Sequence, residues 1–265
     1  MFQTGLRLSL GKRLRAASSA TCIGVEPNWE DYPAETREAL KSADEVGYPT
    51  PLYEDVFLSL GKKVFPANRC RFLGNKIKQT LLFQLLGITH PRTRLYYGRN
   101  RMERISRDFD CPFIAKTPVG SSRGLGVYLI EKPEDLARYL EGHLPAYIQE
   151  YLPLERDLRV IVVLGRVVHA YWRVHAPGEF RNNVSRGATI SFEGIPEEAL
   201  HFARDVAQRC NFTEVGLDVC HAHGRYYVIE ANMVFGLEGF RKAGLDYYEV
   251  LARTVEAEQA LQHSR

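Results

Sequence analysis

The stretch Val215–Asn232, VGLDVCHAHGRYYVIEAN, decides the fold, because polar residues fall where an otherwise apolar hairpin should have none. A His-Gly turn separates its two apolar strands. Glu230 and Asn232 stand two residues apart on an extended chain, so both side chains point to the same face. If the strands pair about this turn, Asp218 lies on the neighbouring strand at nearly the same level. The sequence therefore predicts three oxygen-bearing side chains that converge on one side of a sheet.

Two carboxylates and an amide oxygen form an all-oxygen ligand set. Such a set suits a hard cation that keeps several waters and takes its remaining bonds from phosphate, which means Mg²⁺, with Mn²⁺ as the alternative ion. A solvated hairpin face is the other interpretation, and it would suffice for a single acidic residue. The apolar residues around Asp218, Glu230 and Asn232 favour the metal site.

The composition is that of an ordinary globular protein of 265 residues, with 45% hydrophobic and 25% charged residues. A net charge of +3 argues against a nucleic-acid partner, which needs a concentrated basic surface. No apolar run approaches membrane-spanning length, so no membrane partner is expected. Five scattered cysteines predict reduced thiols in a cytoplasmic protein. The basic, acid-poor start also resembles a transit peptide, but residues 6–10 are better explained as a strand.

The expected elements predict an α+β fold in which two subdomains pack together behind a short N-terminal region. Residues 1–68 make up this region, with helices at 34–43 and 52–60 but without a clear, complete alternation of strands and helices. Residues 69–150 are expected to form a central subdomain that carries a glycine-rich lid. Residues 151–265 are expected to form a C-terminal subdomain that carries the metal site.

A helix over residues 75–86 is expected to open the central subdomain, with Ile77, Leu81, Leu82 and Leu85 on one apolar face. Strands and helices then alternate along the rest of the chain. Strands are expected at 93–97, 112–116, 126–130, 146–150, 157–163, 166–173 and 188–192, and helices at 99–109, 134–140, 196–210 and 247–262.

A glycine-rich segment, PFIAKTPVGSSRGLGVYLI at residues 112–130, joins two of these strands. Gly120 and Gly124 let the backbone approach an anion closely, and the amide groups around Ser121 can then cradle phosphate oxygens. Lys116 ends the preceding strand, where its ammonium can reach the same oxygens. A surface loop explains the glycines alone. Together with Lys116 and a separate cation site, they predict a phosphate site and a water-excluding lid.

Three more polar segments follow along the chain. YIQEYLP at residues 147–153 leaves a strand, where exposed backbone groups can read an adenine edge. In RDLRVIVV, Asp157 and Arg159 share one face of a strand, with a surface ion pair as the alternative. FRNNVSRGA at residues 180–188 presents arginines suited to developing phosphoryl or acyl-phosphate charge, with a solvated loop as the alternative.

The order of these motifs resembles the ATP-grasp fold, and within it the RimK-like branch of ribosomal-protein glutamate ligases and related amino-acid ligases. Lys116 with its glycine loop, QEY, DLR, FRNNVSRGA, GLD and IEAN…GLEG follow one another over roughly residues 70–255. The pair FRNNVSRGA and EANMVFGLEGF is specific, because the spacing between the motifs fits as well as each motif does. Val234 and Phe235 depart from the small residue and proline that usually precede GLEG in the family.

The resemblance implies ATP held between two α+β subdomains. By position, Lys76 and Lys116 are similar to the phosphate-contacting lysines, Gln149, Glu150 and Tyr151 to the adenine hinge, and Asp157, Arg181, Asn182 and Asn183 to further ATP contacts. Asp218, Glu230 and Asn232 match the Mg²⁺ ligands of the family. Arg173 and Arg186 resemble arginines near the acyl phosphate, and with Lys116 they form the expected catalytic set.

The implied activity is that of an ATP-dependent carboxylate–amine ligase, which adds an amino acid such as glutamate to a small molecule or a protein. An ATP-binding sensor or scaffold without turnover is one alternative, and an ATP-grasp phosphoryl transferase is another. Related ligases also lead us to expect a homo-oligomer. Because clustered carboxylates repel one another, Asp218→Ala is expected to abolish activity with little change in folding stability.

Overall fold

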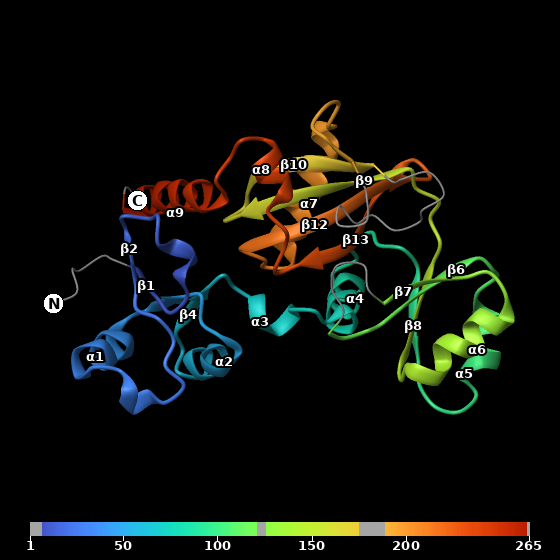
Figure 1. Ribbon diagram of the computed structural model, residues 1–265, viewed down its shortest axis with the longest axis horizontal. Coiled ribbons are helices and arrows are strands. Elements are labelled where there is room, and N and C mark those ends of the chain that lie inside the picture. The colour runs from blue at the N-terminus through green and yellow to red at the C-terminus, as the bar shows by residue number, and fades with distance from the viewer. Residues whose placement is uncertain (1–6, 121–125, 175–188, 264–265) are drawn as a thin grey trace.

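The computed structural model describes residues 7–120, 126–174 and 189–263, in which three β-sheets are built from successive parts of the chain. Figure 1 shows the sheet formed last in the sequence lying between the other two. The mixture of helices with largely antiparallel sheets confirms the expected α+β class. Of the described helices, none is both long and apolar enough to cross a membrane.

The first sheet is parallel, with strand order β2-β1-β3-β4. Its elements are β1 (Arg7–Ser9), η1 (Lys12–Leu14), β2 (Ala20–Cys22), η2 (Trp29–Asp31), α1 (Ala34–Ser42), β3 (Glu45–Gly47), α2 (Pro51–Ser59) and β4 (Lys63–Phe65). The expectation that this region lacks a complete alternation of strands and helices is therefore wrong. Its strands have only three residues each, which is too short for a period of two to be visible.

The second sheet is antiparallel, with strand order β5-β8-β6-β7. Its elements are β5 (Thr93–Tyr96), α5 (Arg101–Asp108), β6 (Phe113–Lys116), β7 (Val127–Ile130), α6 (Pro133–Gly142) and β8 (Ala146–Glu150). Ile105 of α5 and Leu136 of α6 belong to one apolar core with the strands. Every one of these elements overlaps its predicted range.

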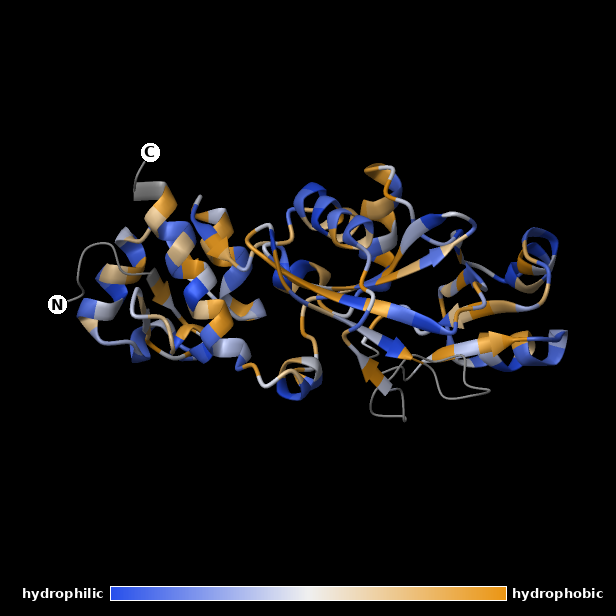
Figure 2. Ribbon diagram, turned by 90° about the horizontal axis from the view of Figure 1, so that it is seen from above, coloured by the Kyte–Doolittle hydropathy of each residue, from blue (hydrophilic) through white to orange (hydrophobic). Residues whose placement is uncertain are grey.

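The third sheet is also antiparallel, with strand order β11-β10-β9-β12-β13. Its elements are β9 (Arg156–Val163), β10 (Arg166–Val174), β11 (Thr189–Ser191), α7 (Glu197–Arg209), β12 (Glu214–Ala222) and β13 (Arg225–Asn232), followed by α8 (Glu238–Lys242) and α9 (Tyr247–His263). Helix α7 covers one face. The opposite face packs on α8 and α9 through Ile161 and Val163 but is polar at Asp157 and Arg159. Figure 2 shows this change from hydrophobic to hydrophilic along the strands.

The hairpin β12–β13 forms about the predicted turn, and Asp218 lies at the predicted level. Asp218 pairs with Glu230, and Gly216 pairs with Asn232, so all four residues share one face of the sheet. A bulge follows directly after Asp218. The turn alone would pair Asp218 with Ile229, so the bulge is what brings Asp218 to the face of Glu230 and Asn232, and the sequence does not reveal it.

Two short helices, α3 (Arg69–Phe72) and α4 (Lys76–Leu85), connect the first sheet to the second. Helix α4 forms where expected, but the predicted apolar face is not the buried one. The buried residues of α4 are Lys76, Gln79, Thr80 and Phe83. In contrast, Leu81 is 47% and Leu85 84% exposed. Helix α4 contacts β13, and the polar residues of the helix find their partners there.

The three sheets fall within residues 1–68, 69–150 and 151–265, the parts expected from the sequence. Packing crosses these limits, because Phe83 and Ile88 join the core formed by the third sheet and α7. The division into domains at these boundaries stays a prediction.

Candidate functional site

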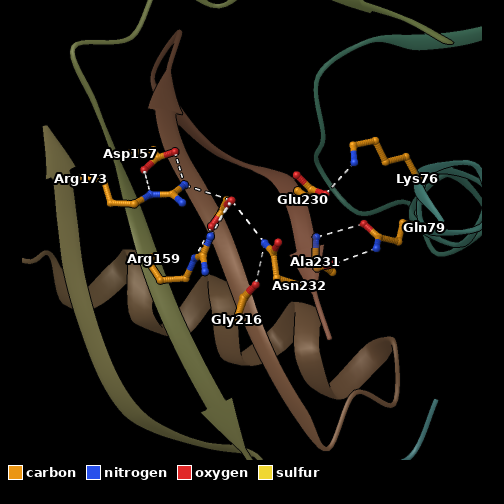
Figure 3. A network of polar contacts seen from close by, with 10 residues as sticks. Lys76, Gln79, Asp157, Arg159, Arg173, Gly216, Glu230, Ala231 and Asn232 are labelled. Carbon is orange, nitrogen blue, oxygen red and sulfur yellow. Dashed lines mark hydrogen bonds and ion pairs between the residues drawn. The ribbon is translucent and has the colours of Figure 1, made fainter. Parts of the chain in front are cut away.

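A buried network of alternating charges occupies the polar face of the third sheet (Figure 3). Arg159 of β9 pairs in register with Asp218 of β12, and Arg173 of β10 pairs in register with Asp157 of β9. Arg173 donates two hydrogen bonds to Asp157, at 2.7 Å from Nε and 2.6 Å from Nη2. Its Nη2 also lies 3.0 Å from Oδ2 of Asp218. Arg159 binds both oxygens of Asp218, with Nη2 at 3.1 Å from Oδ2.

The two arginines of this network determine the ionisation of Asp218. Burial alone would raise the pKa of Asp218, but the guanidinium groups of Arg159 and Arg173 outweigh burial and hold the pKa below its ordinary value. All four network residues, Asp157, Arg159, Arg173 and Asp218, are buried. A carboxylate in this position is therefore ionised and paired, and the expected repulsion between metal-free carboxylates does not describe Asp218.

The other two predicted metal ligands lie beside this network. Asn232 donates from Nδ2 to Oδ2 of Asp218 at 3.3 Å and to the Gly216 carbonyl at 3.2 Å. Oε1 of Glu230 forms an ion pair with Nζ of Lys76 at 3.0 Å, and Lys76 is the first residue of α4. The structure thus brings together the three oxygen-bearing side chains that the sequence predicts.

Gln79 holds the strand between two of these residues. Its Nε2 donates to the Ala231 carbonyl at 2.7 Å, and its Oε1 accepts from the Ala231 amide at 3.1 Å. Figure 3 shows Gln79 and Lys76 extending from α4 toward β13. Ala231 stands between Glu230 and Asn232, so these two bonds set the distance between the helix and the predicted ligands.

A pocket lies between α4 and the strands that face it. Its polar lining includes Lys76, Gln79, Thr80, Lys116, Tyr147, Gln149 and Glu230. Burial lowers the pKa of Lys116 to about 8, assisted by the charge of Lys76 and opposed by the carboxylate of Glu230. Two lysines and one glutamate around one pocket leave an excess of positive charge, which suits a phosphate group.

The predicted hinge residues end strand β8 at the edge of this pocket. The Gln149 side chain is buried and donates from Nε2 to Oγ1 of Thr93 at 2.9 Å. Oε1 of Glu150 accepts from the Arg92 amide at 2.6 Å. Both side chains therefore have protein partners, so that backbone groups are better placed than these side chains to read a base. Tyr151 follows the strand and is half-buried.

The start of the glycine loop lies against the start of α4. The Gly120 amide donates to the Gly74 carbonyl at 3.0 Å, and the Lys76 amide donates to the Pro118 carbonyl at 3.0 Å. Gly120 has φ +76°, a backbone conformation that favours glycine. Six predicted site residues lie outside the described part of the chain, namely Ser121, Gly124, Arg181, Asn182, Asn183 and Arg186.

The donor set fits a divalent cation by its chemistry. No group of three His, Cys, Asp or Glu residues that could hold a metal occurs in the described ranges. Asp218 and Glu230 supply two carboxylates on one face, and the third donor is the amide oxygen of Asn232. A site with so few protein ligands suits a metal that takes its other bonds from water and phosphate.

Two residues of the site were not predicted from the sequence. The sequence places Arg159 on one strand face with Asp157 and leaves a surface ion pair as the alternative, yet Arg159 is buried and binds Asp218. A charged residue inside the apolar strand RDLRVIVV was the available signal. Gln79 gave no such signal, because a polar residue in a surface helix is ordinary.

Known proteins with similar sequences identify the family. Residues 74–255 match the RimK-like ATP-grasp domain, which covers more than half of the chain. The chain belongs to this family. The matched range agrees with the range over which the motifs resemble it.

Two relatives of this RimK-like chain are named as glutamate ligases. A ribosomal protein bS6–L-glutamate ligase from Escherichia fergusonii is 30% identical over 192 residues, which cover 69% of this chain and 63% of the relative. A probable alpha-L-glutamate ligase from a Marinomonas species is 26% identical over 190 residues, with the same coverage of 69% and 63%. This chain thus spans less than two thirds of the length of these relatives.

A solved structure confirms the expected ATP-grasp fold. The ATP-grasp ligase PsnB, in complex with a phosphomimetic variant of a minimal precursor, Mg and ADP, matches with a TM-score of 0.67. The match covers 98% of this chain and 100% of PsnB at 18% sequence identity. At this identity the likeness concerns the fold alone.

Replacing Gln79 with methionine should lower the free energy of unfolding by about 2 kcal/mol, because the buried amide and carbonyl of Ala231 lose their partners. Gln84→Met is the matched control, since Gln84 lies exposed on the same helix and makes one bond of 3.3 Å. Denaturant unfolding of both variants measures the difference. Equal losses would show that the Gln79 bonds do not stabilise β13.

Replacing Asp218 with alanine should lower the free energy of unfolding by about 3 kcal/mol, because Arg159 would be left buried without its partner. This corrects the expectation of a small change. The pKa of Asp218 is lower in the folded than in the unfolded chain, so its contribution is present above about pH 4 and is lost as the pH falls through the folded pKa.

The control for Asp218 is Asp205→Ala, which removes an exposed pair with Arg209 at 3.2 Å and should change stability by less than about 0.5 kcal/mol. Urea unfolding from neutral to acidic pH compares the two variants with the parent. An Asp218→Ala protein as stable as the control would contradict the importance of the buried pairs.

Proposed function

We propose that this protein is an ATP-dependent carboxylate–amine ligase. The observation that carries the proposal is the meeting of Lys76 and Glu230 at one pocket, directly beside Asp218 and Asn232. Positive charge for phosphate and oxygen ligands for a cation thus adjoin each other. The family supports the same activity, since relatives in it are named as ligases.

ATP would place its phosphates near Lys76, Lys116 and the loop that starts at Gly120. Its base would lie at the end of β8, near Gln149, Glu150 and Tyr151. Asp157, Arg181, Asn182 and Asn183 are proposed as further nucleotide contacts. Asp157 is held by Arg173, so it would act through that arginine rather than as an isolated carboxylate.

Asp218, Glu230 and Asn232 would hold Mg²⁺, and Mn²⁺ is the alternative ion. The cation, when bound, would neutralise charge on the phosphate oxygens of ATP. Lys76 already neutralises Glu230, and Arg159 and Arg173 neutralise Asp218. When Mg-ATP is bound, these lysine and arginine side chains would interact with the phosphate oxygens as well as with the carboxylates.

In the proposed reaction, an oxygen of the substrate carboxylate attacks the γ-phosphorus of ATP, and the bond to the β–γ bridging oxygen breaks to release ADP. An amine then attacks the acyl carbon, loses a proton and displaces inorganic phosphate, which leaves an amide. Lys116, Arg173 and Arg186 would stabilise the charge that develops on the oxygens. No protein nucleophile is required, because the substrate carboxylate attacks the phosphorus itself. The protein would accelerate the reaction by positioning the substrates and by stabilising charge.

The substrates are proposed from the relatives. An amino acid such as glutamate would be joined to a small molecule or a protein, because related chains are named as glutamate ligases for ribosomal protein bS6 and for a coenzyme F420 derivative. A cytoplasmic location and a homo-oligomer remain predictions. A sensor without turnover and a phosphoryl transferase are the competing functions, and the products distinguish them.

Purified protein with Mg-ATP should release ADP when a carboxylate and an amine are supplied together, and the product should gain the mass of an amide-linked group. Panels that pair amino acids with carboxylates provide the measurement, with each substrate omitted in turn as the control. Binding of Mg-ATP without turnover for any pair would reject the ligase. A product that gains only phosphate would identify a phosphoryl transferase.

Binding of Mg-ATP should weaken as the pH rises above about 8. The pKa of Lys116 is lowered to about 8, and the charged ammonium form, which attracts phosphate, is lost above this pH. The affinity of the wild type should fall by up to about tenfold per pH unit until the pKa in the complex is reached. The Lys116→Arg protein should lack this dependence, since arginine stays charged. Calorimetric titration at several pH values checks both, and an affinity of the wild type that stays constant above pH 8 would be inconsistent with this role.

A further inference from the structure

One short part of the chain carries the whole of its net positive charge. Residues 92–110, which include β5 and α5, hold six arginines and three acidic residues. The chain has 35 basic and 32 acidic residues, so the rest of it holds 29 of each sign. A net charge confined in this way belongs to one surface rather than to the molecule as a whole, and it would attract anions to that surface.

Four of these arginines gather around Asp108 and the ring of Tyr96. We call this group the arginine surface, and it consists of Arg92, Arg94, Arg104 and Arg107. Nη1 of Arg94 lies 2.8 Å from Oδ2 of Asp108, and Nε of Arg107 lies 3.3 Å from Oδ1. Nη1 of Arg92 donates to the backbone carbonyl of Asp108 at 2.9 Å. Within the described ranges, Asp108 supplies the one carboxylate that pairs with these arginines, so three positive charges have no counterpart.

Two buried aromatic rings hold three of the guanidinium groups in place. Cζ of Arg92 lies 4.1 Å from the centroid of the Phe109 ring. Cζ of Arg94 and Cζ of Arg104 lie 5.8 Å and 5.5 Å from the centroid of the Tyr96 ring. A ring orders a guanidinium without neutralising its charge, and it leaves the N–H groups free for an acceptor. The arginines are therefore preorganised for an anion.

The arginines are more exposed than the carboxylate between them. The Arg94 side chain is 53% and the Arg107 side chain 74% exposed, whereas the Asp108 side chain is 12% exposed. The Tyr96 hydroxyl donates to Oδ2 of Asp108 at 2.9 Å, which anchors this carboxylate below the guanidinium groups. A ligand from solvent therefore meets positive charge first. Guanidinium groups that outnumber their carboxylates repel one another, and an anionic ligand would relieve this repulsion.

The arginine surface lies on the side of the second sheet that faces away from the proposed nucleotide pocket. Tyr96 and Phe109 belong to the core that α5 and α6 form with the sheet. Tyr147 and Gln149 line the pocket and alternate along β8 with Ile148, which belongs to that core. Figure 1 shows α5 and α6 on the far side of this sheet from α4. A partner bound at the arginine surface would leave the pocket open.

Protein carboxylates fit this surface better than a nucleic acid does. Single-stranded nucleic acids stack their bases on open aromatic rings, but Tyr96 and Phe109 are buried beneath guanidinium groups. Tyr97 is 56% exposed, but one ring is no platform for successive bases. A duplex-binding protein contacts about six to ten phosphates, more than three unpaired charges can neutralise. Planar carboxylates, in contrast, match the paired N–H groups of arginine.

We propose that the arginine surface is a docking site for an acidic segment of a protein partner, a short run of aspartate or glutamate residues. The site goes beyond the proposed ligase function, because binding there requires neither ATP nor turnover. The concentration of charge, the ordered guanidinium groups and their exposure together carry the proposal.

A peptide of six L-glutamates with a neutral fluorophore is the probe, and fluorescence anisotropy with the full chain measures its binding. Arg94→Gln combined with Arg104→Gln should weaken binding about tenfold, because two exposed charge pairs are lost. Arg107→Gln alone should weaken binding about threefold, and it keeps the test decisive if the double variant does not fold. An increase in salt from 50 to 200 mM should weaken binding to the wild type as well, since exposed pairs are screened.

Arg204→Gln combined with Arg253→Gln is the matched control. Both arginines are exposed, on α7 and α9, and the change removes the same total charge from other surfaces. This variant should bind the peptide with less than about a twofold change, because distant exposed charges are largely screened. A peptide of six L-glutamines should not bind, and saturating Mg-ATP should leave the affinity for the acidic peptide unchanged.

Three outcomes would overturn the docking site: no binding of the acidic peptide to the wild type at low salt, an equal loss of affinity in the control variant, or displacement of the peptide by Mg-ATP. A single-stranded RNA of six uridines is the last comparison. If it binds more tightly than the peptide and depends on the same arginines, the partner is a nucleic acid and the proposal is wrong. A lack of ADP release in the ligase assay would reject the ligase and leave the docking site intact.

Discussion

The site depends on the burial of Asp218 between Arg159 and Arg173. The three side chains come from neighbouring strands, and Asp157 binds Arg173 in turn. Acids and bases alternate in this network because an unpaired charge at this depth would cost several kcal/mol. A slip of one residue between the strands would turn these charges toward the apolar face under α7, so the network also specifies the register. One set of ion pairs therefore determines both the shape of the sheet and the charge that a ligand meets.

Helix α4 belongs to the site rather than to the cover of the sheet. Gln79 binds both backbone groups of Ala231, and Lys76, one turn earlier, binds Glu230. Because these contacts come from successive turns of one helix, they hold the strand as a rigid unit. The strand in turn decides which side of the helix is buried, and Leu81 and Leu85 consequently face solvent. The tertiary contact outweighs the amphipathic pattern that the helix has on its own.

Features that depend on neighbours in the sequence could be predicted, and features that depend on distant partners could not. The turn brings the strands of Asp218 and Glu230 together, although the bulge after Asp218 completes their pairing, and β8 forms at residues 146–150 as expected. The ion pair of Arg159 joins residues 59 positions apart, and the sequence carries no record of which strand lies beside β9. The clamp of Gln79 on Ala231 spans 152 positions and was missed for the same reason. In the N-terminal sheet β1 (Arg7–Ser9) lies within the strand expected at residues 6–10, whereas β2, β3 and β4 were missed because three residues are too few to show a period.

Packing fixes the segment that follows the proposed metal ligands at three points. Arg69 binds the Met233 carbonyl, the Phe235 ring covers Gly216, and Gly239 lies against the ring of Tyr171. A Cβ added at Gly239 would lie only 2.1 Å from Tyr171, so this position requires glycine, and one added at Gly216 would lie 3.1 Å from Phe235, which would have to shift slightly. Met233 and Phe235 are buried, whereas Val234 between them is 50% exposed. Val234 is therefore a position at which the side chain can change without repacking the core.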